Sequence, residues 1–134
     1  MQYIWQLQDE TYDYRPLYEQ NGWTNYLRDW DKTCRAIQHS KTLSALSDHQ
    51  VVGLIRAVTD GETILYIQDL LVLPKYQRRG IGTHLLKQLL SKYPGVGQIV
   101  LIAEASKTAE LFYAQMGFQT IPTDYGTALV LDRR

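Results

Sequence analysis

A short basic loop followed by two glycines is the part of this sequence best suited to bind an anion. An apolar run at residues 65–73 precedes the loop, residues 75–79, which leads into Gly80 and Gly82, and apolar residues then recur at helical spacing over residues 81–93. The first amide groups of a helix lack internal partners and lie at the positive end of its dipole. Glycine lets a ligand approach the backbone closely. This strand–loop–helix unit therefore predicts a site for a phosphate or pyrophosphate.

The spacing of the glycines excludes two well-known phosphate loops. A Walker A loop needs a lysine directly after its second glycine, and no lysine follows Gly80 there. A dinucleotide fingerprint needs a third glycine where this chain has Leu85. Residues 77–82, QRRGIG, instead fit the pattern Gln/Arg-x-x-Gly-x-Gly/Ala, and they follow a strand that ends in Val-x-Pro. In this the segment resembles the coenzyme A loop of the GNAT N-acetyltransferases.

A second segment carries the same resemblance. Residues 109–118 read AELFYAQMGF, which is similar to the family's Ala-x-x-Phe-Tyr-x-x-x-Gly-Phe. Both motifs occur in the family order, with a predicted strand between them, and the resemblance extends over nearly the whole chain. It implies a single α/β (α+β) domain over residues 1–134, with a mixed central sheet flanked by helices, and acetyl-CoA as the cofactor.

The resemblance also implies how coenzyme A would be held. In the family, the glycine loop binds the pyrophosphate, and the pantetheine arm pairs with the central strand after a local bulge. A backbone N–H near Leu71 would then face the acetyl carbonyl and stabilise the developing oxyanion. Ser106 stands where many relatives carry asparagine and offers a hydroxyl instead. The cofactor-binding residues expected on this basis are Leu71, Val72, Leu73, Gln77, Arg78, Arg79, Gly80, Ile81, Gly82, Thr83 and Ser106.

Tyr113 is the residue expected to act as general acid. A phenol with a reference pKa of about 10 is protonated at neutral pH and can donate a proton to the departing thiolate. Helical spacing alone would make Tyr113 a core aromatic. The match of residues 112–118 to the family motif favours the catalytic role.

The sequence does not assign the general base. Many relatives carry a glutamate on the central strand where this chain has Gln68, whose amide cannot take a proton. Asp69 is adjacent, but on a regular strand it would point to the opposite face, unless a bulge intervenes. Glu104, after the next strand, is another candidate. Deprotonation through water and direct selection of the neutral amine stay open as well.

The acceptor site is expected where the first two helices meet the sheet. Trp23 and Tyr26 lie in the connection between those helices and would line the site together with Gln68 and Asp69. Packing of the two aromatics against the core is equally compatible with the sequence. No motif in these loops identifies the acceptor.

Composition narrows the range of partners. Lys+Arg and Asp+Glu both number 14, so the formal net charge is zero, which argues against a nucleic-acid partner. The single cysteine, Cys34, rules out an internal disulfide, and the three histidines share no metal-ligand spacing. No window approaches the roughly 18–20 apolar residues of a membrane span, and no signal-peptide pattern opens the chain. We therefore expect no metal, no membrane contact and a cytoplasmic location.

Periodicity and turn residues predict the elements that would position these groups. Strands are expected at 3–7, 42–46, 51–59, 63–73 and 98–103, and a closing hairpin at 118–120 and 127–131. Helices are expected from Tyr14 to a stop near residues 21–22, at 27–37, at 81–93, and after Ser106, which would be the N-cap of the last helix. The strand–helix–strand order of residues 63–103 requires that the two strands be parallel. The continuous apolar run at 99–103 indicates a central strand covered on both faces.

The resemblance implies an N-acetyltransferase of the GNAT type, which moves the acetyl group of acetyl-CoA to a primary amine of a small molecule by direct attack in a ternary complex. A protein or peptide amine is the alternative acceptor. A non-catalytic acyl-CoA-binding module is a different class, supported by the missing carboxylate at Gln68. A toxin acting on charged tRNA would need a basic surface, which the zero net charge disfavours. An edge strand at 127–131 would allow a homodimer.

Overall fold

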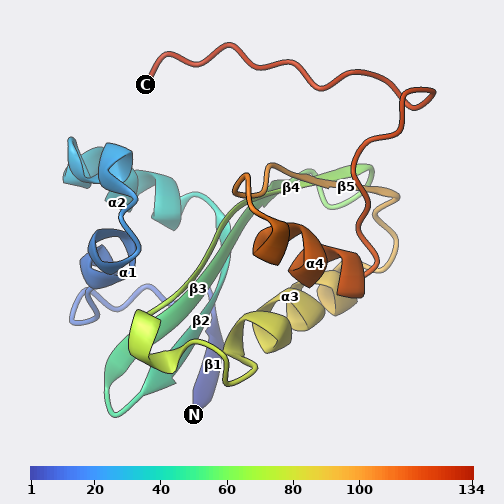
Figure 1. Cartoon of the computed structure of the whole chain (residues 1–134). Coiled ribbons are helices and arrows are strands. Elements are labelled where there is room, and N and C mark those ends of the chain that lie inside the picture. The colour runs from blue at the N-terminus through green and yellow to red at the C-terminus, as the bar shows by residue number, and fades with distance from the viewer. The chain divides into compact units, whose positions relative to one another are not determined.

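The computed structural model describes residues 1–134, which form two compact units, residues 1–101 and residues 102–134. The first unit contains one five-stranded sheet with the order β1-β2-β3-β4-β5 (Figure 1). Its strands are β1 (Gln2–Trp5), β2 (Lys41–Ser47), β3 (Gln50–Thr59), β4 (Ile64–Val72) and β5 (Gln98–Leu101). Strands β1 to β4 are antiparallel neighbours, and β5 pairs parallel to β4. This confirms the mixed sheet and the predicted parallel pair.

Helices cover both faces of this sheet. The helical elements of the first unit are α1 (Arg15–Gln20), the short 3-10 helix η1 (Thr24–Leu27), α2 (Trp30–Gln38), the 3-10 helix η2 (Pro74–Tyr76) and α3 (Ile81–Lys92). Figure 1 shows α1 and α2 on one side of the strands and α3 on the other. None of the helices in the chain combines the length and the apolarity needed to cross a lipid bilayer.

The face under α3 is closely packed. Ile81, Leu85 and Leu89 recur at helical spacing and are buried, as expected for the inner stripe of an amphipathic helix. Gly53 of β3 lies directly beneath this stripe, because a Cβ at that position would stand 3.1 Å from Ile81 Cγ2 and 3.2 Å from Leu85 Cδ1. A glycine is therefore needed at this point for the helix to approach the sheet.

A bulge in β4 decides which side chains reach the opposite face. Arg56 pairs with Asp69 and Ala57 pairs with Ile67, so Gln68 is an extra residue in the ladder. Gln68 and Asp69 consequently point to the same face, where each contacts a tyrosine from the segment that contains α1 and η1. Of the two alternatives left open by the sequence, a regular strand with Asp69 pointing away or a bulge that turns it, the structure has the bulge.

The second unit contains one helix, α4 (Lys107–Gln115), and no strand. Ser106 caps its start as predicted, because the Ser106 hydroxyl accepts a hydrogen bond from the N–H of Ala109 at 3.1 Å. The closing hairpin predicted at 118–120 and 127–131 does not form, and Leu129, Val130 and Leu131 are exposed. Strand-forming residues need a partner strand, and an isolated hairpin is barely stable in water. The edge strand invoked for a homodimer is therefore absent.

Several element boundaries also differ from the prediction. Asp29 accepts a hydrogen bond from the N–H of Lys32 at 3.2 Å and so caps α2, which shifts the start of the predicted second helix to Trp30. The apolar run at 99–103 yields a strand only as far as Leu101. That strand is half-buried and lies at the edge of the sheet of residues 1–101, so the predicted central position was wrong.

Candidate functional site

The glycine loop presents free amide groups at the start of α3. Gly80 is the residue before the helix and has a left-handed backbone (φ 82°), a conformation that glycine adopts without steric cost. The first backbone bond of the helix runs from His84 N–H to the Gly80 carbonyl, at 3.0 Å. The N–H groups of residues 81–83 therefore precede the helical hydrogen-bond ladder and point out of its N-terminus. This is the geometry that the sequence predicted for binding a phosphate.

Three basic side chains lie in the loop that leads to these amides. Lys75, Arg78 and Arg79 are exposed, and none of them forms an ion pair with a carboxylate anywhere in residues 1–134. Arg78 has a left-handed backbone (φ 63°), which is uncommon for a residue with a Cβ and marks a tight turn of the loop. The loop thus carries positive charge that the protein itself does not neutralise.

Gln77 has a different place in the loop from its basic neighbours. Its side-chain amide donates to the Val72 carbonyl at 3.0 Å and to Asn21 Oδ1 at 3.2 Å. Asn21 in turn donates to the same Val72 carbonyl at 3.2 Å. The Gln77 side chain therefore fastens the loop to the end of β4 and to the end of α1, and the cofactor contact predicted for this residue remains a prediction.

The end of β4 leaves one edge of its backbone open. The parallel pairing with β5 stops at Ile67 and Leu101, so residues 68–72 have a strand neighbour only on the β3 side within the first unit. On that side, the Leu73 N–H donates to the Val52 carbonyl at 2.9 Å. Because successive amides of a strand point in opposite directions, the Leu71 amide also faces β3, and those of Leu70 and Val72 face the open edge.

This alternation refines the prediction for the central strand. Leu71, Val72 and Leu73 were expected to bind the pantetheine arm together, with an N–H near Leu71 facing the acetyl carbonyl. The Leu73 amide is already used within the sheet, and its side chain is buried. The N–H groups near Leu71 that are turned toward the open edge belong to its two neighbours, Leu70 and Val72.

A buried ion pair lies on the α1 face of the sheet beside this edge. Asp69 is completely buried, and its Oδ2 accepts hydrogen bonds from Arg56 Nε at 2.6 Å and from the Tyr18 hydroxyl at 2.8 Å. Arg56 also donates to the Ser40 hydroxyl at 3.1 Å. The other carboxylate oxygen, Oδ1, is buried and has no hydrogen-bond partner. Such an orphan acceptor is costly and rare, and it marks this cluster as a place where a ligand or a solvent molecule is expected.

The electrostatics of the cluster follow from burial and from the charge of Asp69. Burial and the negative charge of Asp69 both raise the pKa of the Tyr18 phenol, so Tyr18 keeps the proton that it donates to the carboxylate. Burial opposes the charge on Arg56, but the adjacent carboxylate outweighs it and raises the pKa of the guanidinium. The Arg56 guanidinium therefore keeps its positive charge in the folded protein.

The residues predicted for the acceptor site gather around this cluster. Gln68 Nε2 donates to the Tyr26 hydroxyl at 2.6 Å. The Tyr26 ring lies 4.9 Å from the Tyr18 ring and 5.9 Å from the Trp23 ring, centroid to centroid. Burial and the charge of Asp69 raise the pKa of Tyr26. All four predicted residues, Trp23, Tyr26, Gln68 and Asp69, therefore belong to one contiguous group.

Sequence reasoning missed two members of this group, Tyr18 and Arg56. The sequence did contain a signal for Arg56. Arg56 is the one charged residue in the apolar run 51–58, and Asp69 is the one charged residue in the run 64–73. Opposite charges in adjacent strands of a hairpin indicate a cross-strand pair. Tyr18 carried no such signal, since a helical tyrosine is usually a packing residue.

Tyr113 lies on α4 in the second unit and is half-buried. Burial raises the pKa of its phenol, so Tyr113 is protonated at neutral pH, as a general acid must be. The helix ends there in a Schellman motif: the Phe118 N–H donates to the Tyr113 carbonyl, the Gly117 N–H donates to the Ala114 carbonyl, and Gly117 is left-handed (φ 94°). The Phe118 ring packs on Tyr113 at 5.8 Å.

The Schellman motif gives a structural reason for the spacing Phe-Tyr-x-x-x-Gly-Phe, independent of catalysis. The catalytic role of Tyr113 and the cofactor contact of Ser106, whose hydroxyl caps α4, remain predictions. Glu104, the alternative base, is exposed. In no part of residues 1–134 do three or more His, Cys, Asp or Glu side chains gather as a metal site would require.

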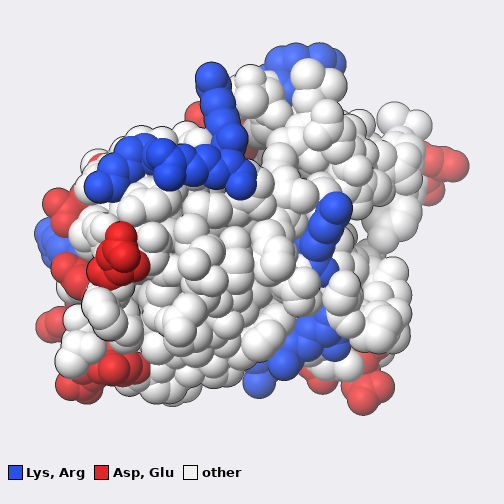
Figure 2. Space-filling view, turned by 90° about the horizontal axis from the view of Figure 1, so that it is seen from below, with Lys and Arg blue, Asp and Glu red and all other residues white.

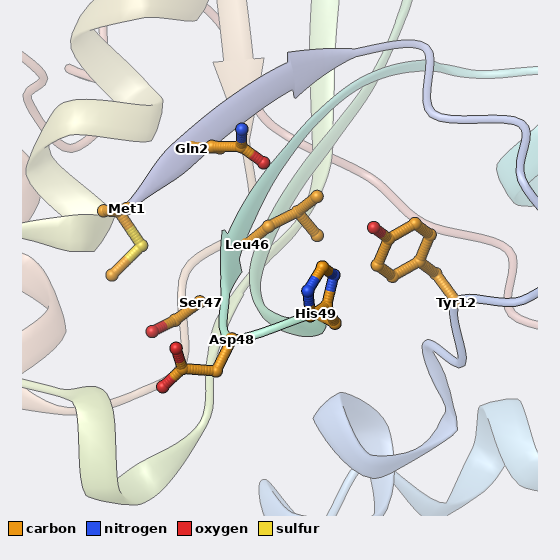
Figure 3. A pocket seen from close by; sticks show the side chains of 7 residues that line it. All are labelled: Met1, Gln2, Tyr12, Leu46, Ser47, Asp48 and His49. Atoms are coloured by element: carbon orange, nitrogen blue, oxygen red, sulfur yellow. The ribbon is translucent and has the colours of Figure 1, made fainter.

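A separate hollow of about 290 Å³ lies at the start of β1 and the tip of the β2–β3 hairpin. It is lined by Met1, Gln2, Tyr12, Leu46, Ser47, Asp48 and His49 (Figure 3). Asp48 and His49 form the turn, both with a left-handed backbone.

Comparisons with known proteins give a consistent family. A family model described as an acetyltransferase (GNAT) domain matches residues 10–127. The structure is similar to that of a GNAT family acetyltransferase from Streptococcus pneumoniae TIGR4, with 34% identity and a TM-score of 0.78 over 99% of this chain and 98% of the other. An aminoglycoside acetyltransferase from soil, solved with sisomicin, has a TM-score of 0.63 over 99% and 93% of the two chains but 17% identity, which shows the fold alone.

Among curated proteins, the chain is 28% identical over 127 residues to histone acetyltransferase TAP1 of Glycine max. The alignment covers 84% of this chain and 53% of that protein. The chain spans about half the length of the curated relatives it matches.

Proposed function

We propose that this chain, which belongs to the GNAT family of acetyltransferases, moves the acetyl group of acetyl-CoA to a primary amine of a small molecule by direct attack in a ternary complex. Members of the family use acetyl-CoA as the acetyl donor. The observation that carries the proposal is the open edge of β4, residues 68–72, which leads through a basic loop directly into the free amides of α3. One end of the chain's central strand thus offers hydrogen bonds, and the loop after it offers positive charge.

The residues of this unit fit the parts of acetyl-CoA. The amides of residues 81–83, with Arg78 beside them, would hold the pyrophosphate, whose charge suits the positive end of the helix dipole. The outward N–H groups of Leu70 and Val72 would pair with the amide-rich pantetheine arm. The one of them nearest the acetyl carbonyl would donate to its oxygen as negative charge develops there, which is the role of an oxyanion hole.

The acceptor would lie on the α1 face, against Gln68, Tyr26 and Trp23. Because the Gln68 amide nitrogen is engaged by the Tyr26 hydroxyl, its carbonyl oxygen is left to accept a hydrogen bond. The buried Oδ1 of Asp69, which has no hydrogen-bond partner, adds a negative charge next to Gln68. A group of acceptor oxygens next to a carboxylate favours a ligand that donates N–H groups, which a primary amine does. We assign Asp69 the part of a positioning residue that holds Tyr18 and Arg56.

Tyr113 is proposed as the acid that protonates the departing thiolate. Its pKa is raised by burial, so the phenol keeps its proton until the thiolate is formed. An amine on a protein or peptide is the second candidate acceptor. It is favoured by the 28% identity to a protein named histone acetyltransferase, and the same residues would serve it.

A calorimetric titration with acetyl-CoA tests the proposal first. We expect binding in the micromolar range, abolished in Gly82→Glu, because a carboxylate in the first turn of α3 blocks and repels the pyrophosphate. Gly95→Glu adds the same charge at an exposed glycine with open space around it and should bind normally. No binding by the unaltered protein would refute the proposal.

A second experiment separates transfer from mere binding. Acetyl-CoA is incubated with polyamines, amino acids, aminoglycosides and peptides that carry free N-termini, and the acetylated acceptor is detected by mass spectrometry. Acetylation of a small amine supports the proposed acceptor class, and acetylation of peptides alone replaces it by the second candidate. Tight binding of acetyl-CoA without transfer to any of these amines would instead favour a non-catalytic acyl-CoA-binding module.

A further inference from the structure

Two cations in the glycine loop share one aromatic ring. Lys75 Nζ lies 5.5 Å from the centroid of the Tyr76 ring, and Arg79 Cζ lies 5.2 Å from the same centroid. Tyr76 is half-buried at the end of η2, while the two cationic side chains are exposed. The ring attracts each cation through its negative face and so restrains two long, flexible side chains near one ring.

This pair of charges has no counterion in the protein. Both side chains are cationic, and neither Lys75 nor Arg79 has a carboxylate within ion-pair distance. The view from below shows Lys and Arg side chains projecting from a face that is largely uncharged (Figure 2). A ligand with two negative charges on one small group would supply a counterion for both cations, and a phosphate monoester is such a group.

Acetyl-CoA carries this group on its ribose. The pyrophosphate in the middle of the molecule is a diester-like anion that suits the amides at the start of α3, and the separate 3′-phosphate is a monoester with close to two charges at neutral pH. Arg79 immediately precedes Gly80, so its side chain leaves the backbone next to the pyrophosphate site. Lys75 and Tyr76 lie at the start of the loop, on η2.

We propose that Lys75 and Arg79, held in place by Tyr76, bind the 3′-phosphate of acetyl-CoA and make this chain prefer coenzyme A to its 3′-dephospho form. The inference rests on the proposed function, since it assumes that coenzyme A is the ligand. The preference arises at the cluster alone, because both forms of the ligand carry the same pyrophosphate, pantetheine and acetyl groups.

Calorimetric titrations with acetyl-CoA and with 3′-dephospho-acetyl-CoA test this. For two partly exposed ion pairs to a dianion, we expect the unaltered protein to bind acetyl-CoA about tenfold more tightly. Lys75→Gln and Arg79→Gln should each reduce this ratio by about threefold, and the double variant should bring it near one. Binding of the dephospho form should stay within about twofold in every variant, and the preference of the unaltered protein should shrink at high salt.

Lys87→Gln is the matched control. Lys87 is exposed on α3, its replacement removes the same charge, and it lies more than a helical turn from the loop. We expect its ratio of affinities to equal that of the unaltered protein.

Three outcomes would overturn the inference while leaving the proposed function intact. They are equal binding of the two ligands by the unaltered protein, an equal loss for both ligands in the Lys75 and Arg79 variants, and a drop in preference for Lys87→Gln as large as that for Arg79→Gln. The second would place the cations at the pyrophosphate, and the third would show a long-range effect of net charge. Failure of the unaltered protein to bind either ligand would refute the proposed function itself, and the inference with it.

Discussion

Replacing Asp69 by asparagine should destabilise the protein more than any other isosteric change on its sheet. The carboxylate is completely buried, and the side chain of its partner Arg56 has a relative exposure of 8%. The substitution keeps the shape of the residue but removes its charge, so the guanidinium is left buried without a counterion. Breaking a buried ion pair from one side costs about 3–5 kcal/mol. That is a large part of the roughly 5–15 kcal/mol that stabilises a typical domain.

The comparison with an exposed ion pair sharpens this expectation. Arg15 and Glu19 form an ion pair on α1 with Nε–Oε1 3.0 Å and relative exposures of 42% and 48%. Glu19→Gln, the same chemical change at the surface, should cost less than about 0.5 kcal/mol. Both free energies of unfolding can be measured by urea denaturation followed by circular dichroism. Equal losses for Asp69→Asn and Glu19→Gln would refute the claim that the Asp69–Arg56 pair is desolvated.

A double variant separates the pair from its surroundings. Arg56→Met combined with Asp69→Leu removes both charges, and buried ion pairs are often replaced by apolar residues with little loss. Tyr18 and Ser40 then lose one hydrogen-bond partner each, so we expect a loss of about 1–3 kcal/mol. The double variant should therefore be more stable than the sum of its single variants predicts, by at least about 2 kcal/mol. Additive losses would show that the two side chains do not interact.

Three further predictions follow from other parts of the structure. Tyr113→Phe keeps the ring against Phe118 but removes the hydroxyl, so turnover should fall by about 10²-fold with unchanged affinity for acetyl-CoA, and full turnover would exclude Tyr113 as the acid. Gly53→Ala places a Cβ 3.1 Å from Ile81 Cγ2 and should cost about 1–3 kcal/mol of stability in urea denaturation, whereas an alanine at an exposed glycine with free space should cost little. Hydrogen bonds from Thr63 and the following backbone amides lower the pKa of Asp60, so its stabilisation is present above about pH 4 and is lost as the pH falls; Asp60→Asn should therefore flatten the acid side of the stability profile.

The glycine loop and the element order could be predicted from the sequence because their signals are local. The capping hydroxyl of Ser106, the left-handed Gly80 and the apolar stripe of α3 depend on residues a few positions apart. The parallel pairing of β4 and β5 followed from the handedness and length of the connection between them. Each of these features is dictated by the chemistry of a short segment, whatever the rest of the chain does.

The acceptor-side cluster could be predicted only in part. Trp23, Tyr26, Gln68 and Asp69 were chosen from the sequence, and the structure brings them together, but their arrangement depends on the bulge at Gln68. A bulge is a mismatch between two strands, so it has no signature in either strand alone. The same bulge turns Asp69 toward Tyr18, which is 51 residues away in the chain.

The sequence by itself determined that this chain contains a basic glycine loop at the start of a helix, a parallel strand pair around it and a helix that carries Tyr113, because each rests on near neighbours. Only the tertiary structure decided which amides of β4 face its open edge, that Arg56 neutralises Asp69, and that residues 127–131 are not a strand. These three depend on hydrogen bonds or charges from distant segments. A strand-forming segment needs a neighbouring strand, and a buried carboxylate needs a counterion, and in both cases the partner comes from a distant part of the chain.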